Sequence, residues 1–334
     1  MTRKRILVTG ASGCIGHYLS EALIEGTEHE LYLLVRNPEK LQVDCDARPG
    51  IRVLQGDMQD IDQLSSLLQH VDIAVLAATC WGGEQEVFDI NITKTIRLLQ
   101  LLDPERCEQV IYFSTASVLD RQNQVLKQAG QLGTDYIRSK YICLSQLQRL
   151  AIAPKITTVF PTLVLGGDDR KPYSHLSAGL PDVQSWIGLA RFFQADASFH
   201  FIHARDIAQV TCYLIDHPRG PDQSRWLVLG NPPLTLNQAI EQVCAYFNKR
   251  IYFQLPLSLW LANIFIVVFR VQMAAWDRFC LTYRHFTYED VINPASFGLS
   301  SYCPTLTDAF KLRGISPEKP STLSESSVTQ ADKD

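Results

Sequence analysis

The sequence predicts an α/β protein built on a doubly wound parallel sheet, with a smaller α/β part at its C-terminal side. Short runs rich in Val, Ile and Leu alternate with helical patterns through the first half. A glycine-rich turn follows the first run, and after Pro161 the alternation becomes less regular. We therefore expect a nucleotide-binding domain over 1–165, a substrate domain over 166–315 and a polar, disordered tail over 316–334.

Each expected element has a local justification. Short apolar runs predict strands; they are RILVTG (5–10), ELYLLVR (30–36), IRVLQGD (51–57), VDIAVLAA (71–78), QVIYFSTAS (109–117), KITTVFPT (155–162) and RWLVLGN (225–231). Helical spacing predicts helices over 14–26, 60–70, 86–103, around Tyr136, and over 182–195 and 235–249. Residues 199–217 predict a strand followed by a helix that can pack back onto the first domain, and 166–181 predict a loop. The expected N-caps are Asp60, Asp206 and Thr235.

The composition argues against several classes of protein. A net charge of −4 over 334 residues, with no long basic cluster, gives no electrostatic surface for nucleic acid. Nine cysteines, an odd number without a Cys-x-x-Cys pair, argue against a disulfide framework or a zinc site. The basic N-terminus runs directly into a strand pattern and lacks the features of a signal peptide. These observations favour a cytoplasmic protein that binds no metal.

One strongly apolar stretch needs separate treatment. Leu255 to Phe269 contains only Ser258 and Asn263 as polar interruptions, and its 15 residues are fewer than the roughly 20 that span a bilayer. The favoured interpretation is a buried helix of the second domain. Peripheral membrane contact through 255–276, or a homodimer interface, are the alternatives.

The sequence LVTGASGCIG places three glycines between the first strand and the first helix. Gly10 permits a tight turn, Gly13 lets the backbone approach a pyrophosphate, and Gly16 allows close packing of helix on strand. The helix N-terminus then offers free N–H groups to the phosphates. This arrangement predicts a dinucleotide site of the Rossmann type.

The end of the second strand bears on the choice of cofactor. Arg36 stands where a carboxylate would bind the ribose hydroxyls of NAD, and Lys40 follows it. A guanidinium can instead clamp a 2′-phosphate, to which Ser12 would add a hydroxyl contact. These residues predict NADP, with NAD as the alternative. Asp57 is placed to accept a hydrogen bond from the adenine amino group.

Tyr136 and Lys140 lie four residues apart, so both face one side of the predicted helix. A free tyrosine titrates near ~10 and is a poor base at neutral pH. A neighbouring ammonium and a cationic oxidised nicotinamide both favour the phenolate and lower the pKa of the tyrosine, so Tyr136 would exchange a proton with a substrate while hydride moves at the nicotinamide. The strand end FSTASV supplies Ser114, Thr115 and Ser117 as candidates to hold the substrate oxygen.

Together these motifs resemble the short-chain dehydrogenase/reductases, and the length and second part resemble the extended branch, of the NAD-dependent epimerase/dehydratase type with some 3β-hydroxysteroid dehydrogenase-like character. LAAT (76–79), DINITKTIRLL (89–99), FPTLVLGG (160–167) and FIHARDIA (201–208) match further landmarks. The resemblance implies Thr115 as the catalytic hydroxyl and Asn91 as the support of Lys140. It implies cofactor contacts from Cys14, Ile15, Met58, Ala77, Ala78, Thr79 and Pro161.

Two departures bear on the substrate. Nucleotide-sugar members often carry VYG motifs where this chain has VLD (118–120) and FPTLVLG (160–166). Phe160, Trp81, Trp186 and Phe193 are candidates to line an apolar substrate region, although core packing is the favoured interpretation for any single one. His203 is expected to be structural.

The sequence thus predicts an NADP(H)-dependent oxidoreductase that interconverts a secondary alcohol and a carbonyl on a small, apolar substrate. Two alternatives stay open: a nucleotide-sugar epimerase or dehydratase with tightly bound NAD, and a non-catalytic NADP-binding scaffold or redox sensor.

Overall fold

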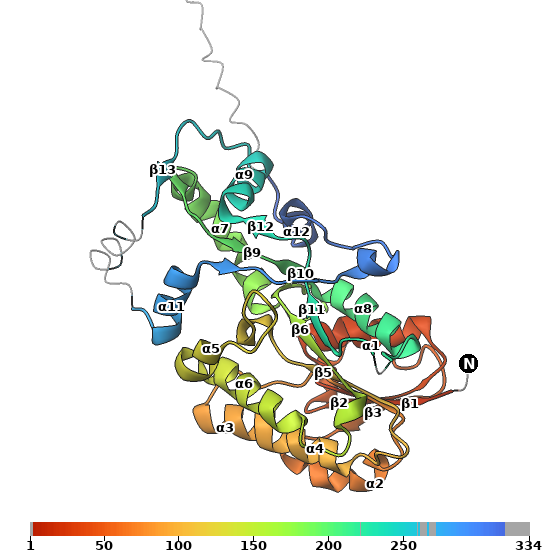
Figure 1. The fold of residues 1–334 in the computed structure, drawn as a ribbon. Coiled ribbons are helices and arrows are strands. Elements are labelled where there is room, and N and C mark those ends of the chain that lie inside the picture. Colours follow the sequence, from red (N-terminus) through yellow and green to blue (C-terminus); the bar gives the residue numbers. More distant parts are fainter. Residues whose placement is uncertain (1–2, 221, 259, 261–265, 267–271, 318–334) are drawn as a thin grey trace, which may run out of the picture.

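The structure, a computed structural model, describes residues 3–220, 222–258, 260, 266 and 272–317. One part carries a large sheet between two helical layers, and the other carries short strands and helices above it (Figure 1). None of the helices in the described ranges has the length and apolar content needed to cross a membrane.

The large sheet has seven strands, all parallel to their neighbours. β1 lies between β2 and β4, so the direction of winding reverses there, and this is the place where open α/β sheets bind ligands. The predicted doubly wound fold is therefore confirmed. In spatial order the strands are β11 (Trp226–Leu229), β6 (Ile156–Pro161), β5 (Gln109–Phe113), β4 (Ile73–Leu76), β1 (Arg5–Thr9), β2 (Glu30–Val35) and β3 (Ile51–Gln55).

Helices cover both faces of this sheet, and each layer has its own apolar core. On one face, α1 (Cys14–Gly26) and α8 (Ala204–Asp216) pack Leu19, Leu23 and Val210 against the strands. On the other face the core includes Leu98, Ile137 and Leu144. The elements of that second layer are η2 (Met58–Leu64), α2 (Ser65–Leu68), α3 (Glu84–Phe88), η3 (Asp89–Lys94), α4 (Thr95–Leu101), α5 (Lys127–Leu132) and α6 (Asp135–Leu147).

The smaller part is assembled from short elements around a third apolar core, which includes Phe201, Phe247 and Phe310. Its strands pair as β7 (Leu163–Leu165) with β10 (Phe201–His203), β9 (Ser198–Phe199) with β12 (Leu234–Thr235) and β14 (His285–Phe286), and β8 (Phe193–Gln194) with β13 (Leu255–Pro256). Its helices are α7 (His175–Ala190), α9 (Leu236–Tyr246), α11 (Ala275–Tyr283) and α12 (Leu306–Leu312). The remaining short helices are η1 (Pro38–Lys40), η4 (Ala116–Val118), η5 (Ala153–Lys155) and η6 (Pro294–Phe297).

The chain crosses between the two parts after residue 165. α8 packs against α1, and β11 pairs with β6 at the edge of the large sheet. The strand and helix expected over 199–217 do pack back in this way. The boundaries 1–165 and 166–315 themselves stay a prediction.

Three local predictions are corrected by the structure. Asp57, rather than Asp60, caps η2, because its side chain accepts from the Gln59 amide at 2.9 Å. His203, rather than Asp206, caps α8. α7 begins at His175 inside the predicted loop, because Ser174 caps it and Pro181 is accommodated within the helix. The predicted cap Thr235 is confirmed, in a capping box with Gln238.

The predicted helix over 86–103 also contains a feature that periodicity does not indicate. Asp89–Lys94 form a π-helical turn, in which the Thr95 hydroxyl donates to the Ile90 carbonyl at 2.9 Å. Such turns insert an extra residue and shift the side chains that follow.

Half of the stretch 255–276, and the tail from 318 onward, lie outside the described residues. The described side chains of Leu255 and Trp260 are 52% and 72% exposed.

Candidate active site

The predicted glycine turn lies between β1 and α1, against the end of β4. Gly10 has a φ of +70°, and a Cβ there would lie 2.7 Å from the Cα of Ala78. A Cβ on Gly16 would lie 2.0 Å from the Gly10 carbonyl oxygen. Side chains are therefore excluded at both glycine positions. The carboxyl ends of β1 and β4 lie close together, because the Ala78 amide donates to Thr9 Oγ1 at 3.2 Å.

The same turn fits the pyrophosphate of a dinucleotide. Gly13 is the exposed N-cap of α1, and no side chain caps the helix there. A Cβ on Gly13 would meet only the Gly10 carbonyl oxygen, at 3.3 Å, so the outer side of the turn is open. Free N–H groups at a helix N-terminus beside an open glycine turn are the elements of a phosphate site.

The other residues predicted to contact the cofactor differ in how deeply they are buried. Cys14 turns its thiol toward Gly166 and Ser174, and burial raises the pKa of that thiol to about 12. Met58 is 8% exposed within the apolar core, and Ala77, Ala78 and Thr79 follow directly after β4. For Cys14, Ile15, Met58 and Pro161 at the buried end of β6, cofactor contact stays a prediction.

Arg36 immediately follows β2, and its side chain is 72% exposed. Its guanidinium lies 3.8 Å from Glu86, a loose surface ion pair that leaves its donors largely available. Asp57 uses Oδ1 to cap η2. Ser12 is half-buried in the glycine turn.

Thr115 and Tyr136 come together at the carboxyl edge of the sheet. Thr115 follows β5 and caps η4, and its Oγ1 accepts from the Ser117 amide at 3.4 Å. α6 begins at Asp135, capped by Thr134, and carries Tyr136 in its first turn. The Thr115 side chain is hydrogen-bonded to the Tyr136 phenol. Ser114 is buried, and its hydroxyl has no partner among the described residues.

Lys140 lies one turn along α6 from Tyr136 and is 2% exposed. Its Nζ donates to the Phe113 carbonyl at 2.9 Å and lies 5.0 Å from the centre of the Tyr112 ring. The distance from Nζ to the centre of the Tyr136 ring is 6.0 Å. The i, i+4 spacing therefore places both side chains on the buried face of the helix.

The pKa values in this pair are set mainly by burial. Burial lowers the pKa of Lys140 to about 8. Burial also raises the pKa of Tyr136 above its ordinary value, and the hydrogen bond with Thr115 offsets only part of that rise. Lys140 is not among the causes of that rise, and the expectation that Lys140 and an oxidised nicotinamide together lower the pKa of Tyr136 stays a prediction. Tyr136 is a protonated phenol at neutral pH, which suits a proton donor.

Asn91 makes four direct hydrogen bonds, and its support of Lys140, which the resemblance implies, stays a prediction. It is fully buried in the π-helical turn, and its Nδ2 donates to the Cys80 carbonyl and to Ser139 Oγ, each at 3.0 Å. Its Oδ1 accepts from the Cys80 amide at 2.8 Å and from Thr79 Oγ1 at 3.1 Å. Within the described ranges it makes no hydrogen bond with Lys140; it fastens the segment after β4 to α6.

The aromatic residues expected near a substrate divide into three groups. Trp81 stacks on Tyr136, with ring centres 3.7 Å apart and planes 18° apart. Phe160 is fully buried against Trp226, which confirms core packing, the favoured one of its two interpretations. Trp186 is 67% exposed on α7, and Phe193 is half-buried in β8. The direct contact between Trp81 and Tyr136 has no local sequence signal.

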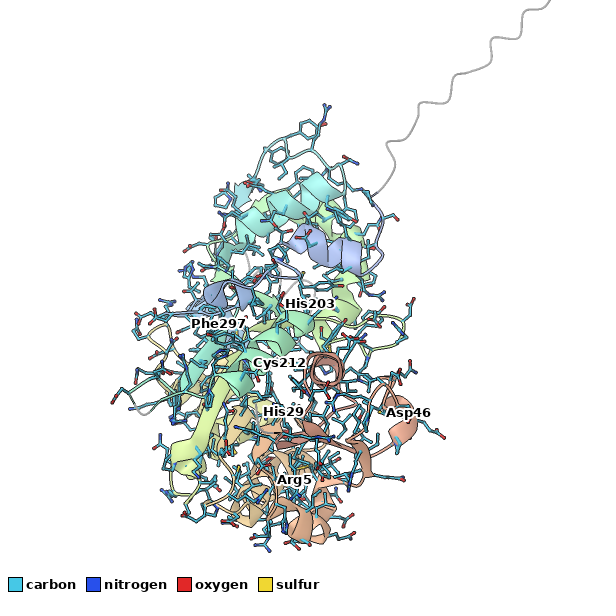
Figure 2. The ribbon with its side chains drawn as sticks, turned by 90° about the vertical axis from the view of Figure 1, so that its right-hand side faces the viewer. Arg5, His29, Asp46, His203, Cys212 and Phe297 are labelled. Carbon is cyan, nitrogen blue, oxygen red and sulfur yellow. The ribbon has the colours of Figure 1, made fainter. Side chains whose placement is uncertain are left out.

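His203 lies at the start of α8, between the two parts of the molecule (Figure 2). Its Nδ1 accepts from the Arg205 amide at 3.1 Å, and its ring packs against Tyr18 and Tyr302. Burial lowers its pKa to about 4. These contacts give His203 a structural role, as the sequence predicts.

A parallel sheet with a glycine turn at its winding reversal, next to a Thr–Tyr–Lys group, defines a Rossmann-type oxidoreductase site. A profile of the NAD dependent epimerase/dehydratase family matches residues 6–230, and the chain belongs to this family. It is an enzyme of the NAD(P)-dependent oxidoreductase type.

Three similar proteins set this in context. Sterol demethylase protein B of Methylococcus capsulatus is 28% identical over 237 residues, which cover 67% of this chain and 69% of the relative. Probable pinoresinol-lariciresinol reductase 3 of Arabidopsis thaliana is 22% identical over 72% of each chain. The dTDP-glucose 4,6-dehydratase of Bacillus anthracis, solved in complex with NAD, has a TM-score of 0.60 at 13% identity and covers 93% of this chain and 96% of its own.

Proposed function

We propose that this protein is an NADP(H)-dependent reductase that converts a carbonyl on a small, apolar substrate to a secondary alcohol. One observation carries the proposal: a half-buried phenol is hydrogen-bonded to Thr115, with the Lys140 Nζ 6.0 Å from its ring, at the same carboxyl edge of the sheet as the glycine turn. A bound reduced nicotinamide supplies the hydride in this chemistry.

The residues of the site then have separate tasks. With a reduced nicotinamide bound, the Tyr136 hydroxyl would donate its proton to the carbonyl oxygen, and Thr115 would hold that oxygen in place. The step leaves a phenolate on Tyr136, which the Lys140 ammonium stabilises electrostatically. A proton from solvent restores the phenol.

The choice of substrate class draws on two observations. Trp81 lies on Tyr136, which provides an aromatic surface beside the reacting hydroxyl. One relative is named for a sterol and another is named a reductase.

The choice of NADP depends on Arg36. A guanidinium that is 72% exposed at the end of β2 is free to bind a 2′-phosphate. Arg36→Asp should weaken NADPH binding by at least about tenfold and leave NADH binding nearly unchanged. Titration of both cofactors by calorimetry measures this, and an unchanged ratio of affinities would remove Arg36 from the cofactor site.

The reaction itself is tested with Tyr136→Phe. The variant keeps the ring that stacks on Trp81 but has no proton to donate, so NADPH consumption with a panel of ketones should fall at least about a hundredfold. Tyr141→Phe, on the same helix, is the matched control and should keep the wild-type rate. Equal rates in wild type and Tyr136→Phe would reject the mechanism.

A second candidate is a dehydratase or epimerase that retains NAD, because the family includes such enzymes. An enzyme of this kind returns the hydride to its own bound intermediate, so NAD should remain with the purified protein. Release of NAD by denaturation, together with no net consumption of NADPH, would favour this candidate.

A further inference from the structure

Trp81 covers one face of the ring that carries the proposed proton donor. The 3.7 Å separation and the 18° angle between the rings describe a nearly parallel stack. The imidazole of His175, the first residue of α7, lies 5.0 Å from the indole. Trp81 is nevertheless 54% exposed, so more than half of this large apolar side chain remains available to a ligand.

The position of Trp81 is fixed by its neighbours on both sides in the chain. Cys80, immediately before it, is held through both its amide and its carbonyl by Asn91. Gly82 and Gly83 follow, and Gly83 has a φ of +79°, which favours glycine. Glu84 then lies 3.6 Å from Arg138 on α6. The indole is thus presented by a segment fastened to the helix that carries Tyr136.

We propose that Trp81 selects the substrate by stacking on a flat, apolar ring attached to the reacting carbonyl. This inference rests on the proposed function, because it places the carbonyl at the Tyr136 hydroxyl. With one face of the phenol closed by the indole, the substituent of that carbonyl lies next to the exposed indole surface. Aromatic pairs favour stacked or edge-to-face contacts, which a flat ring makes better than a puckered one.

Two ketones with the same skeleton separate ring shape from size. Acetophenone carries a flat ring, and cyclohexyl methyl ketone carries a puckered ring with the same number of carbons. Affinity for each is measured by ligand-observed NMR with the nicotinamide cofactor bound, in wild type, Trp81→Ala, Trp81→Phe and Tyr136→Phe. Trp186→Ala is the control, because it truncates an exposed tryptophan on α7.

Wild type should bind acetophenone about three- to tenfold more tightly than its cyclohexyl counterpart, the range expected for one aromatic contact. Trp81→Ala should lose this preference. Trp81→Phe, Tyr136→Phe and Trp186→Ala should retain it. No preference in wild type, or an undiminished preference in Trp81→Ala, would overturn the inference.

Turnover distinguishes the failure of this inference from the failure of the proposed function. If wild type reduces both ketones with equal efficiency and Tyr136→Phe reduces neither, the proposed reductase function stands and the role of Trp81 in selecting the substrate is rejected. If the binding preference depends on Trp81 but no NADPH is consumed, the role of Trp81 in ligand binding stands and the proposed reductase function is rejected.

Discussion

Replacing Lys140 with methionine should stabilise the protein while it impairs the site. Lys140 is 2% exposed, and its pKa of about 8 compares with an ordinary value of 10.5. Because the pKa of Lys140 is lower in the folded protein than in the unfolded chain, the charged ammonium destabilises the folded state. This loss of folding free energy is present in full at any pH below both pKa values. At 1.36 kcal/mol per pKa unit the cost near neutral pH is about 3 kcal/mol. The variant also loses the hydrogen bond to the Phe113 carbonyl, which lowers its free energy of unfolding by about 1 kcal/mol.

The expected net gain is therefore about 2 kcal/mol in the free energy of unfolding near neutral pH. Between the folded value of about 8 and 10.5 the native state releases its proton first, so wild type recovers and the gain shrinks. Urea unfolding near neutral pH and near ~9.5 measures the difference between the two proteins.

Lys94→Met provides the matched control, because Lys94 also donates to one backbone carbonyl, that of Gln59, but at an exposed place. That variant should change stability little at either pH. A Lys140→Met protein less stable than wild type near neutral pH, or a difference that does not vary with pH, would refute the reasoning.

The remaining predictions concern four other positions. Gly16→Ala should lower the free energy of unfolding by about 3 kcal/mol in urea titrations, because its Cβ overlaps the Gly10 carbonyl, whereas Gly26→Ala, with open space around it, should be nearly neutral. Asn91→Ala should cost about 2 kcal/mol and lower turnover, since it releases Cys80 from α6; unchanged values for both would contradict the role described for it. His203→Asn keeps a capping side chain but removes a buried imidazole whose pKa is about 4. Because that pKa lies below the ordinary value of 6.5, wild type should lose stability as the pH falls from 6.5 to about 4. The variant should lose less stability over the same pH range. Glu86→Gln should tighten NADPH binding about two- to threefold relative to NADH by calorimetry, because it frees Arg36; no change would show that the ion pair does not compete.

The elements that sequence predicts well are those with strong local signals. The first strand, glycine turn and first helix are found at their predicted places, because periodicity and glycine spacing act over neighbouring residues. α7 begins seven residues before the predicted helix over 182–195, because the loop-like composition of 166–181 hides the cap at Ser174.

The geometry of the site depended on contacts that no local pattern records. Residue type and spacing predict Tyr136 and Lys140 as a pair, the family resemblance selects Thr115 as their partner, and the structure brings the three together. The direction of the Tyr136 pKa could not be predicted, because it depends on how deeply the helix packs. The partners of Asn91 and Trp81 follow from the π-helical turn and from the approach of the segment after β4, which are tertiary features.

The crossing of the chain after residue 165 has a consequence for any attempt to divide the protein. A fragment ending there would lack β11 and α8, so β6 would become a bare sheet edge and the apolar side of α1, including Leu19 and Leu23, would face water. Such a fragment is expected to aggregate rather than bind nucleotide. Recombination between relatives at that junction should likewise fail, since later residues complete the scaffold on which earlier ones depend.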